Sequence, residues 1–374
     1  MSLRLSPEVD DAFRRMKDFV VTYLQPLEDE LPPFAQKLPP ETARRVRQAL
    51  EDHGLVGLAV PKDLGGHGLG IPGLCAAREA LGHTTLWSLS PLLGSEPPIL
   101  LYRASPEQRE AFLLPTLKGQ RHGAFALTEP EAGSDAGSLS MEAKPVAGGY
   151  LLTGTKVFIS FVEESDYALV FARVPEKGVT LFLVDLPSPG LQVARIMETM
   201  GGAHLARLEF QEVFVPEERR MGEEGEAFAL AQHWFDVDRI ALQPPICIGA
   251  STRVLSLAAS MDLLTEEELG SWTLRLEAAR ALMYRVARDA EEGRPVRHQA
   301  AMVKTFAVEL ALALLDRLLD LLGPKGYSQK FRIERYRRDI RRFAIAAGTL
   351  EIQNHIIARG LLRGYSRPLP GEVN

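Results

Sequence analysis

The chain has 374 residues, of which 46% are hydrophobic and 25% charged, with a formal net charge of −6. This length allows two or three packed units, and the composition is ordinary for a soluble globular protein. The acidic balance argues against a nucleic-acid binder, because such proteins usually present a basic face. Two distant cysteines, Cys75 and Cys247, exclude a disulfide framework and favour a reducing, cytoplasmic location.

Residues 1–122 are predicted to form an N-terminal helical domain. Apolar residues recur at helical spacing in 10–31 and 39–54, and Ser105 is a candidate N-cap of a later helix. The glycine-rich segment 54–70 either cradles a ligand or makes tight turns between helices. The residue pattern alone favours the turns.

Residues 123–225 change character and are predicted to form a small β-domain. Runs of β-branched and aromatic residues are bounded there by glycine, proline and acidic turns, which is typical of strands. These runs are 149–160, 167–174, 179–186 and 205–216.

Residues 226–374 return to long helical segments joined by short loops, which indicates a helix bundle. The most apolar of them, 297–323, contains Lys304, Glu309 and Asp316. These charges predict a buried bundle helix rather than a membrane span. The chain has no G-x-G-x-x-G after a first strand, no P-loop, no H-E-x-x-H and no Cys/His cluster, so neither a nicotinamide-binding unit nor a metal site is expected.

Four motifs carry a resemblance to one family. They are "AFALTEPEAGSDAGSL" followed by "GTKVFIS", "GLVGLAVPKDLGGHGLG", "LEFQEVFVPEERRMGEEGEAF" and "ERYRRDIRRFAIAAGTLEIQNHIIARGLL". In this order they span nearly the whole chain and resemble the motifs of the acyl-CoA dehydrogenase family.

The resemblance implies an α+β, mainly α, fold with a helical N-domain, a small β-barrel middle domain and a C-terminal four-helix bundle. It implies FAD, an acyl-CoA substrate, a role in fatty acid metabolism and an electron-transfer flavoprotein as acceptor. The expected assembly is a homotetramer or dimer, with no nucleic acid and no membrane span.

The resemblance also assigns cofactor residues. Segments around the T-E-P and G-T-K motifs are expected to line the flavin, and the turn before the last helix is expected to lie beside FAD. Ser134 is expected to reach a phosphate of substrate or cofactor. The cofactor residues are Phe125, Leu127, Thr128, Gly133, Ser134, Phe158, Ile159, Ser160, Gly348, Thr349 and Gln353.

Asp236 and Arg239 match the family's substrate-binding D-x-x-R. They are three residues apart, so they share a helix face and can pair, either for substrate or as a simple ion pair. The family's usual catalytic Glu is replaced by Ala347, which cannot accept a proton. A minority of the family places the base just before the arginine, and Asp238 stands there as the candidate base. The alternative for Asp238 is a solvated carboxylate on the helix surface.

Groups that support a neighbouring subunit's FAD pyrophosphate are altered in this chain. The family's R-x-x-F-G is absent, and neither Arg253 nor Arg275 replaces it by position. Its Q-x-x-G-G-x-G is "DLLGPKG", with Asp320 for the glutamine and Pro324 for a glycine. An anionic side chain beside a phosphate is unfavourable.

Three hypotheses follow. The first is an acyl-CoA dehydrogenase that performs α,β-dehydrogenation with Asp238 as base. The second is a non-catalytic or half-site subunit of a hetero-oligomer. The third is a different flavin reaction on the same fold.

Overall fold

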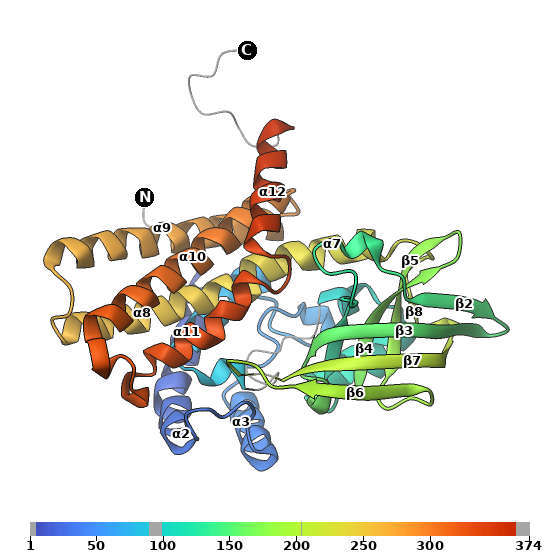
Figure 1. Cartoon of the computed structure of the whole chain (residues 1–374), viewed down its shortest axis with the longest axis horizontal. Helices are drawn as coiled ribbons and strands as arrows, with labels where there is room; N and C mark the ends of the chain where they lie inside the picture. The colour runs from blue at the N-terminus through green and yellow to red at the C-terminus, as the bar shows by residue number, and fades with distance from the viewer. Residues whose placement is uncertain (1–4, 90–98, 203, 364–374) are drawn as a thin grey trace. The chain divides into compact units, whose positions relative to one another are not determined.

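The computed structural model describes residues 5–89, 99–202 and 204–363 (Figure 1). The chain forms two compact units. Within these ranges, the helical unit comprises residues 5–34, 58–87 and 235–363, and the sheet unit comprises residues 35–57, 88–89, 99–202 and 204–234. Helices from both ends of the chain thus share the helical unit.

Capping residues and apolar faces define the helices of the helical unit. Ser6 caps the first helix by accepting a hydrogen bond from Val9 N at 3.3 Å, and Thr265 and Glu268 form a capping box. The principal helices are α1 (Pro7–Phe19), α2 (Gln25–Glu30), α4 (Gly70–Leu81), α8 (Pro244–Ser260), α9 (Glu266–Glu291), α10 (Arg297–Leu322), α11 (Ile333–Arg341) and α12 (Leu350–Leu362). Short turns of π- or 3-10 helix connect them, among them η1 (Val20–Leu24), η2 (Lys62–Leu64), η10 (Gly323–Lys325), η11 (Gln329–Phe331) and η12 (Arg342–Ala344).

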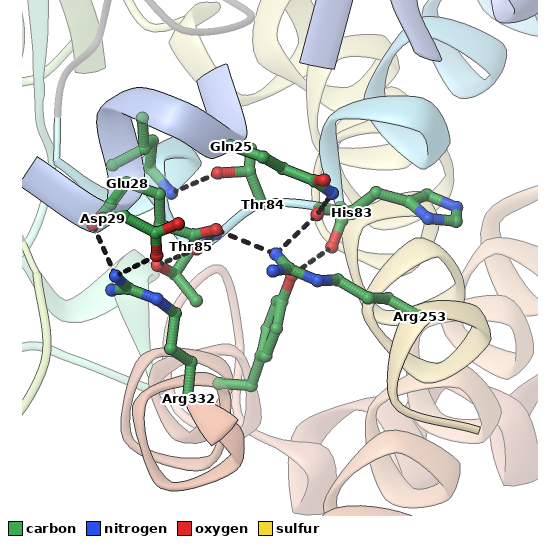
Figure 2. Close-up of polar contacts among 11 residues, drawn as sticks. Gln25, Glu28, Asp29, His83, Thr84, Thr85, Arg253 and Arg332 are labelled. Carbon is green, nitrogen blue, oxygen red and sulfur yellow. Dashed lines mark hydrogen bonds and ion pairs between the residues drawn. The ribbon is translucent and has the colours of Figure 1, made fainter. Parts of the chain in front are cut away.

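A buried carboxylate, Glu28, joins four parts of the helical unit (Figure 2). It accepts hydrogen bonds from Thr85 N at 2.6 Å, from the Thr85 hydroxyl, and from Arg253 Nη1 at 2.9 Å. Arg253 Nη1 also donates to His83 O at 2.7 Å and to the Tyr336 hydroxyl at 3.1 Å. The network therefore connects α2, the residues after α4, α8 and α11.

Replacing Glu28 by Gln is expected to lower the free energy of unfolding by about 2 kcal/mol. Losing one partner of a buried pair costs about 3–5 kcal/mol, and the partial exposure of Arg253 reduces this figure. The measurement is urea unfolding followed by far-UV circular dichroism. The matched control is Asp29→Asn on the same helix, because Asp29 pairs with Arg332 but is 80% exposed. Equal losses in the two variants would contradict the prediction.

Within its described residues, the sheet unit is built on eight strands, whose neighbours follow the order β6-β7-β3-β2-β4-β5-β8, with β1 parallel to β4. The longest antiparallel pair is β3 with β7, and along β7 buried residues alternate with partly exposed ones from Leu205 to Phe210. The strands are β1 (Gly123–Ala126), β2 (Glu142–Val146), β3 (Gly149–Ser160), β4 (Tyr167–Val174), β5 (Gly178–Asp185), β6 (Leu191–Met197), β7 (Leu205–Pro216) and β8 (Arg220–Met221).

Helices and turns accompany the sheet in the same unit. The helices are α3 (Pro40–Asp52), α5 (Pro106–Gln108), α6 (Leu114–Leu117) and α7 (Ala227–Val237), the last of which runs on into the helical unit; the turns include η3 (Leu86–Ser88), η4 (Ile99–Arg103), η5 (Arg109–Leu113), η6 (Ala136–Ser138), η7 (Val162–Glu164) and η8 (Glu217–Arg219). The predicted N-cap at Ser105 is present as a capping box with Gln108.

The predicted order of helices, strands and helices is confirmed, but the predicted β-barrel is wrong in one respect. Among the described strands, β6 and β8 end the sheet without pairing to each other, so the sheet is open. β8 has only two residues, which are too few to pair along the seven residues of β6, and most of β6 is exposed. Over the described ranges, none of the helices combines the length and apolar character of a membrane span.

Candidate active site

The candidate base, Asp238, is the first residue of a π-helical turn between two α-helices. α7 is followed by a π-helical turn, η9 (Asp238–Leu242), and then by Pro244 and Pro245 at the start of α8. Prolines lack the N–H that a continuous α-helix needs, so one helix ends and another begins here. π-Helical turns of this kind are frequent at functional sites.

Asp238 is only 6% exposed, so the solvated-surface alternative is wrong. Gln243 Nε2 donates to its Oδ2 at 3.2 Å, and no hydrogen bond to Oδ1 occurs within the described part of the chain. Burial raises the pKa of Asp238, whereas the charges of Lys304, Arg239 and Arg78 oppose that rise. One oxygen of a desolvated carboxylate is thus left to accept a proton.

The predicted pairing of Asp236 with Arg239 is present, with Arg239 Nη1 at 3.3 Å from Asp236 Oδ1. Both side chains are nearly buried, at 13% and 11% exposure. Arg239 Nε and Gln243 Oε1 are buried and have no hydrogen-bond partner among the described residues. Buried polar atoms without partners are rare in folded proteins, so these two atoms fit a polar ligand or ordered water.

Ala347, at the position of the family's usual glutamate, lies in a strained turn of the same unit. Its φ is +55° and that of Gly348 is +86°. Lys304 Nζ donates to the carbonyl oxygens of Ala346, Ala347 and Gly348, at 2.7 Å for the last. Gln353 Nε2 also donates to Gly348 O, at 2.9 Å. This turn presents a methyl group and no proton acceptor.

The turn leads directly into α12. The Thr349 hydroxyl accepts a hydrogen bond from Ile352 N at 3.4 Å and so caps the helix. Gln353 is fully buried, and its Oε1 has no partner among the described residues. Gly348, Thr349 and Gln353 are therefore brought together at one helix start, as expected.

The two predicted flavin segments meet inside the sheet unit. Val157 N donates to Thr128 O at 2.9 Å, and Lys156 Nζ donates to Leu127 O at 2.9 Å. These bonds place the residues that follow β1 against the last residues of β3. Leu127, Thr128 and Phe158 consequently belong to one local surface.

A bulge in β3 sets the direction of the side chains on this surface. The pairing with β7 shifts between Lys156 and Ile159, and Phe158 has a φ of +59°. The Phe158 ring is 59% exposed, whereas Ile159 is buried in the core of the sheet unit. Ile159 can therefore contact a cofactor only through its backbone. Ser160 is partly exposed at the strand end.

Phe125 differs from its neighbours because its ring is already packed. It stacks on Trp234 with ring centroids 4.2 Å apart and meets Phe171 edge-on at 5.2 Å.

The loop of residues 128–140 is closed by the buried Glu129, which accepts hydrogen bonds from Ser140 N at 2.7 Å and from Lys156 Nζ at 2.8 Å. Gly133 and Ser134 are exposed on this loop, and a Cβ on Gly133 would meet no atom within 4 Å.

Comparison with known proteins divides the chain into three consecutive regions. Residues 7–120, 124–213 and 251–362 match models of the N-terminal, middle and C-terminal domains of acyl-CoA dehydrogenase. The chain belongs to the acyl-CoA dehydrogenase family. Human mitochondrial short-chain specific acyl-CoA dehydrogenase is 33% identical over 335 residues, which cover 83% of this chain and 81% of that protein.

Two further relatives show the range of the family. Subunit CarC of the caffeyl-CoA reductase-Etf complex of Acetobacterium woodii is 29% identical over 345 residues, covering 86% of this chain and 91% of that protein. The structure of butyryl-CoA dehydrogenase from Megasphaera elsdenii is 27% identical, with a TM-score of 0.86, and covers 97% of this chain and 100% of that one. The predicted flavoprotein oxidoreductase acting on CH–CH groups, with FAD as its cofactor, is confirmed.

The sheet-unit residues of this family member fit a flavin ring. Phe158 offers an exposed aromatic face, and Thr128 and Ser160 offer hydroxyl groups near it. The arginines considered as substitutes for R-x-x-F-G are otherwise engaged. Arg253 pairs with Glu28, and the Arg275 guanidinium lies 5.2 Å from the centre of the Trp272 ring. Asp320 is exposed on α10.

Sequence reasoning missed Lys304, Gln243 and the Glu129–Lys156 pair as site residues. A single lysine within an otherwise apolar stretch of α10 was a signal for Lys304. Nothing in the local pattern marks Gln243, because its role depends on the π-helical turn.

Proposed function

We propose that this chain catalyses α,β-dehydrogenation of an acyl-CoA thioester, with Asp238 as the base that removes the α-proton. One observation carries the proposal: the buried carboxylate of Asp238 has a free oxygen, whereas Ala347 offers no acceptor. FAD, when bound, supplies the acceptor for the hydride that leaves the β-carbon.

The chain's own groups support proton removal in three ways. Gln243 fixes the orientation of the carboxylate through Oδ2. The charges of Lys304, Arg239 and Arg78 favour the ionised form that a base requires. The exclusion of water strengthens each of these electrostatic effects. The raised pKa of Asp238 in turn makes it a stronger base than an exposed aspartate.

Other assignments complete the proposal. In the helical unit, Arg239 and Asp236 are proposed to bind substrate, and Gly348, Thr349 and Gln353 to bind FAD. In the sheet unit, Phe158, Thr128 and Ser160 are proposed to contact the flavin, and Ser134 a phosphate of substrate or cofactor. Leu127, Gly133 and the Ile159 backbone line the same cofactor surface, and Phe125 supports it through the stack with Trp234.

We further propose an electron-transfer flavoprotein as the electron acceptor. The relative CarC is by its name a subunit of a reductase-Etf complex, which supports this assignment. The same name supports the second hypothesis, in which this chain is one subunit of a hetero-oligomer.

The test is anaerobic mixing of the purified, FAD-loaded chain with a series of acyl-CoA thioesters. We expect loss of the oxidised-flavin absorbance and formation of the matching 2-enoyl-CoA, identified by mass spectrometry. If the chain binds FAD but none of the thioesters reduces that FAD, the result would support the hypothesis of a half-site subunit. A product other than 2-enoyl-CoA would support different flavin chemistry.

A further inference from the structure

Lys304 is completely buried on α10, yet the reaction as described gives it no contact with substrate. Its ammonium group donates to three successive carbonyls, those of Ala346, Ala347 and Gly348. Three consecutive carbonyls can converge on one donor because the backbone is left-handed at both Ala347 and Gly348. Lys304 therefore lies at the centre of the turn that precedes α12.

The turn needs such a support. A left-handed conformation is unfavourable for alanine and persists only where surrounding contacts impose it. Gln353 supplies a neutral contact through Nε2 to Gly348 O at 2.9 Å, and Lys304 supplies the charged one. The two side chains reach the turn from α12 and α10 respectively.

α10, which carries Lys304, packs against η9, which carries Asp238, and the charge of Lys304 acts on the Asp238 carboxylate. The charged groups around Asp238 are Arg239 on η9, Arg78 on α4 and Lys304 on α10, and Lys304 has the largest effect of the three. In return, burial lowers the pKa of Lys304 to about 8 and Asp238 acts against this change. Gln243 completes the surroundings as a neutral donor.

We propose that Lys304 is a positioning residue for the proposed dehydrogenation: its ammonium group fixes the Ala346–Gly348 turn and holds a positive charge beside the Asp238 carboxylate. Lys304 thus fixes the turn in which Ala347 replaces the family's usual glutamate, and its charge favours the ionised form of Asp238. This inference rests on the proposed function, because it needs Asp238 to act as the base.

The test uses the FAD-loaded protein and a 3-thia acyl-CoA carrying deuterium at the α-carbon. Asp238 can remove the α-deuteron, and solvent can return a proton, but sulfur at the β-position prevents hydride loss. Deuterium washout measured by mass spectrometry therefore reports proton removal without redox turnover. The rate is recorded against pH.

In Lys304→Met, the acid limb of the washout profile is expected to move up by at least about one pH unit, because an opposing charge near the carboxylate is lost. Lys304→Arg keeps the charge and should stay within about half a pH unit of wild type. Gln353→Met loosens the turn without removing a charge. The washout rate of this variant should therefore fall, while the acid limb of its pH profile should stay at the wild-type pH. Lys304→Gln serves as the neutral variant if Lys304→Met does not fold.

Amide hydrogen exchange over residues 345–353 provides a second readout. Faster exchange is expected in both Lys304→Met and Gln353→Met, because each removes a support of the turn. An unmoved acid limb in the neutral Lys304 variants, with normal wild-type washout, overturns the role of Lys304 alone. A wild-type protein that shows no washout overturns the proposed function instead.

Discussion

Replacing Asp238 by Asn is expected to slow anaerobic flavin reduction by an acyl-CoA about 10²–10⁴-fold, which is the usual contribution of general-base catalysis. Asparagine has nearly the same shape and can keep the bond to Gln243, so the bound FAD content should stay at the wild-type level. The expected loss is in the rate at saturating substrate, because the base acts on the proton in transfer rather than on thioester binding.

The rate of flavin reduction should also depend on pH in a direction that the pKa of Asp238 determines. Burial raises the pKa of Asp238, so the wild-type rate should fall as pH drops through a value above that of an ordinary aspartate. The residual rate of Asp238→Asn should lack this acid limb. Asp238→Glu is the matched control, because it keeps the carboxylate and extends it by one methylene group. Asp238→Asn with more than about a tenth of the wild-type rate would exclude Asp238 as the base.

The sequence was most informative where one local pattern determines one element. The strands at 149–160, 167–174 and 205–216 were predicted with the bounds that the structure has, because β-branched and aromatic runs end there at glycine, proline or acidic residues. β1, β2, β6 and β8 were not predicted. They are short or mostly exposed, so no apolar pattern marks them.

The candidate site divides in the same way. Motif matches proposed Thr128, Phe158 and Gly348 as cofactor residues, because each lies within a short contiguous motif. The surroundings of Asp238 depend instead on Lys304 and Arg78, which come from distant helices. The spacing of apolar residues cannot predict that a charged residue on one helix will act on a carboxylate of another helix. A π-helical turn within a long helical segment also has no clear sequence pattern.

The buried pair of Lys156 and Glu129 illustrates how strongly such distant contacts can matter. The two side chains are 0% and 4% exposed and meet at 2.8 Å. Ser140 N and Met141 N also donate to Glu129, and Lys156 Nζ donates to Leu127 O. The pair therefore holds the loop that carries Ser134 and the backbone next to Thr128.

Lys156→Met is accordingly expected to lower the free energy of unfolding by about 3–5 kcal/mol, because it leaves a buried carboxylate without its cation. FAD should also dissociate more readily, since Leu127 and Thr128 lose their support. The measurements are urea unfolding and flavin retention after dialysis. Lys37→Met is the matched control in the same unit: Lys37 pairs with Glu163 at 3.3 Å but is 50% exposed, so its loss should stay below about 1 kcal/mol.

The double variant Lys156→Met with Glu129→Gln separates charge from packing. Glutamine keeps an acceptor for Ser140 N and Met141 N but needs no cation, so at least half of the lost stability should return. A double variant as unstable as Lys156→Met would show that the cost comes from packing around the lysine stem. Recovery of stability together with flavin retention would instead assign the effect to the unpaired carboxylate, and would link this buried pair directly to the cofactor surface.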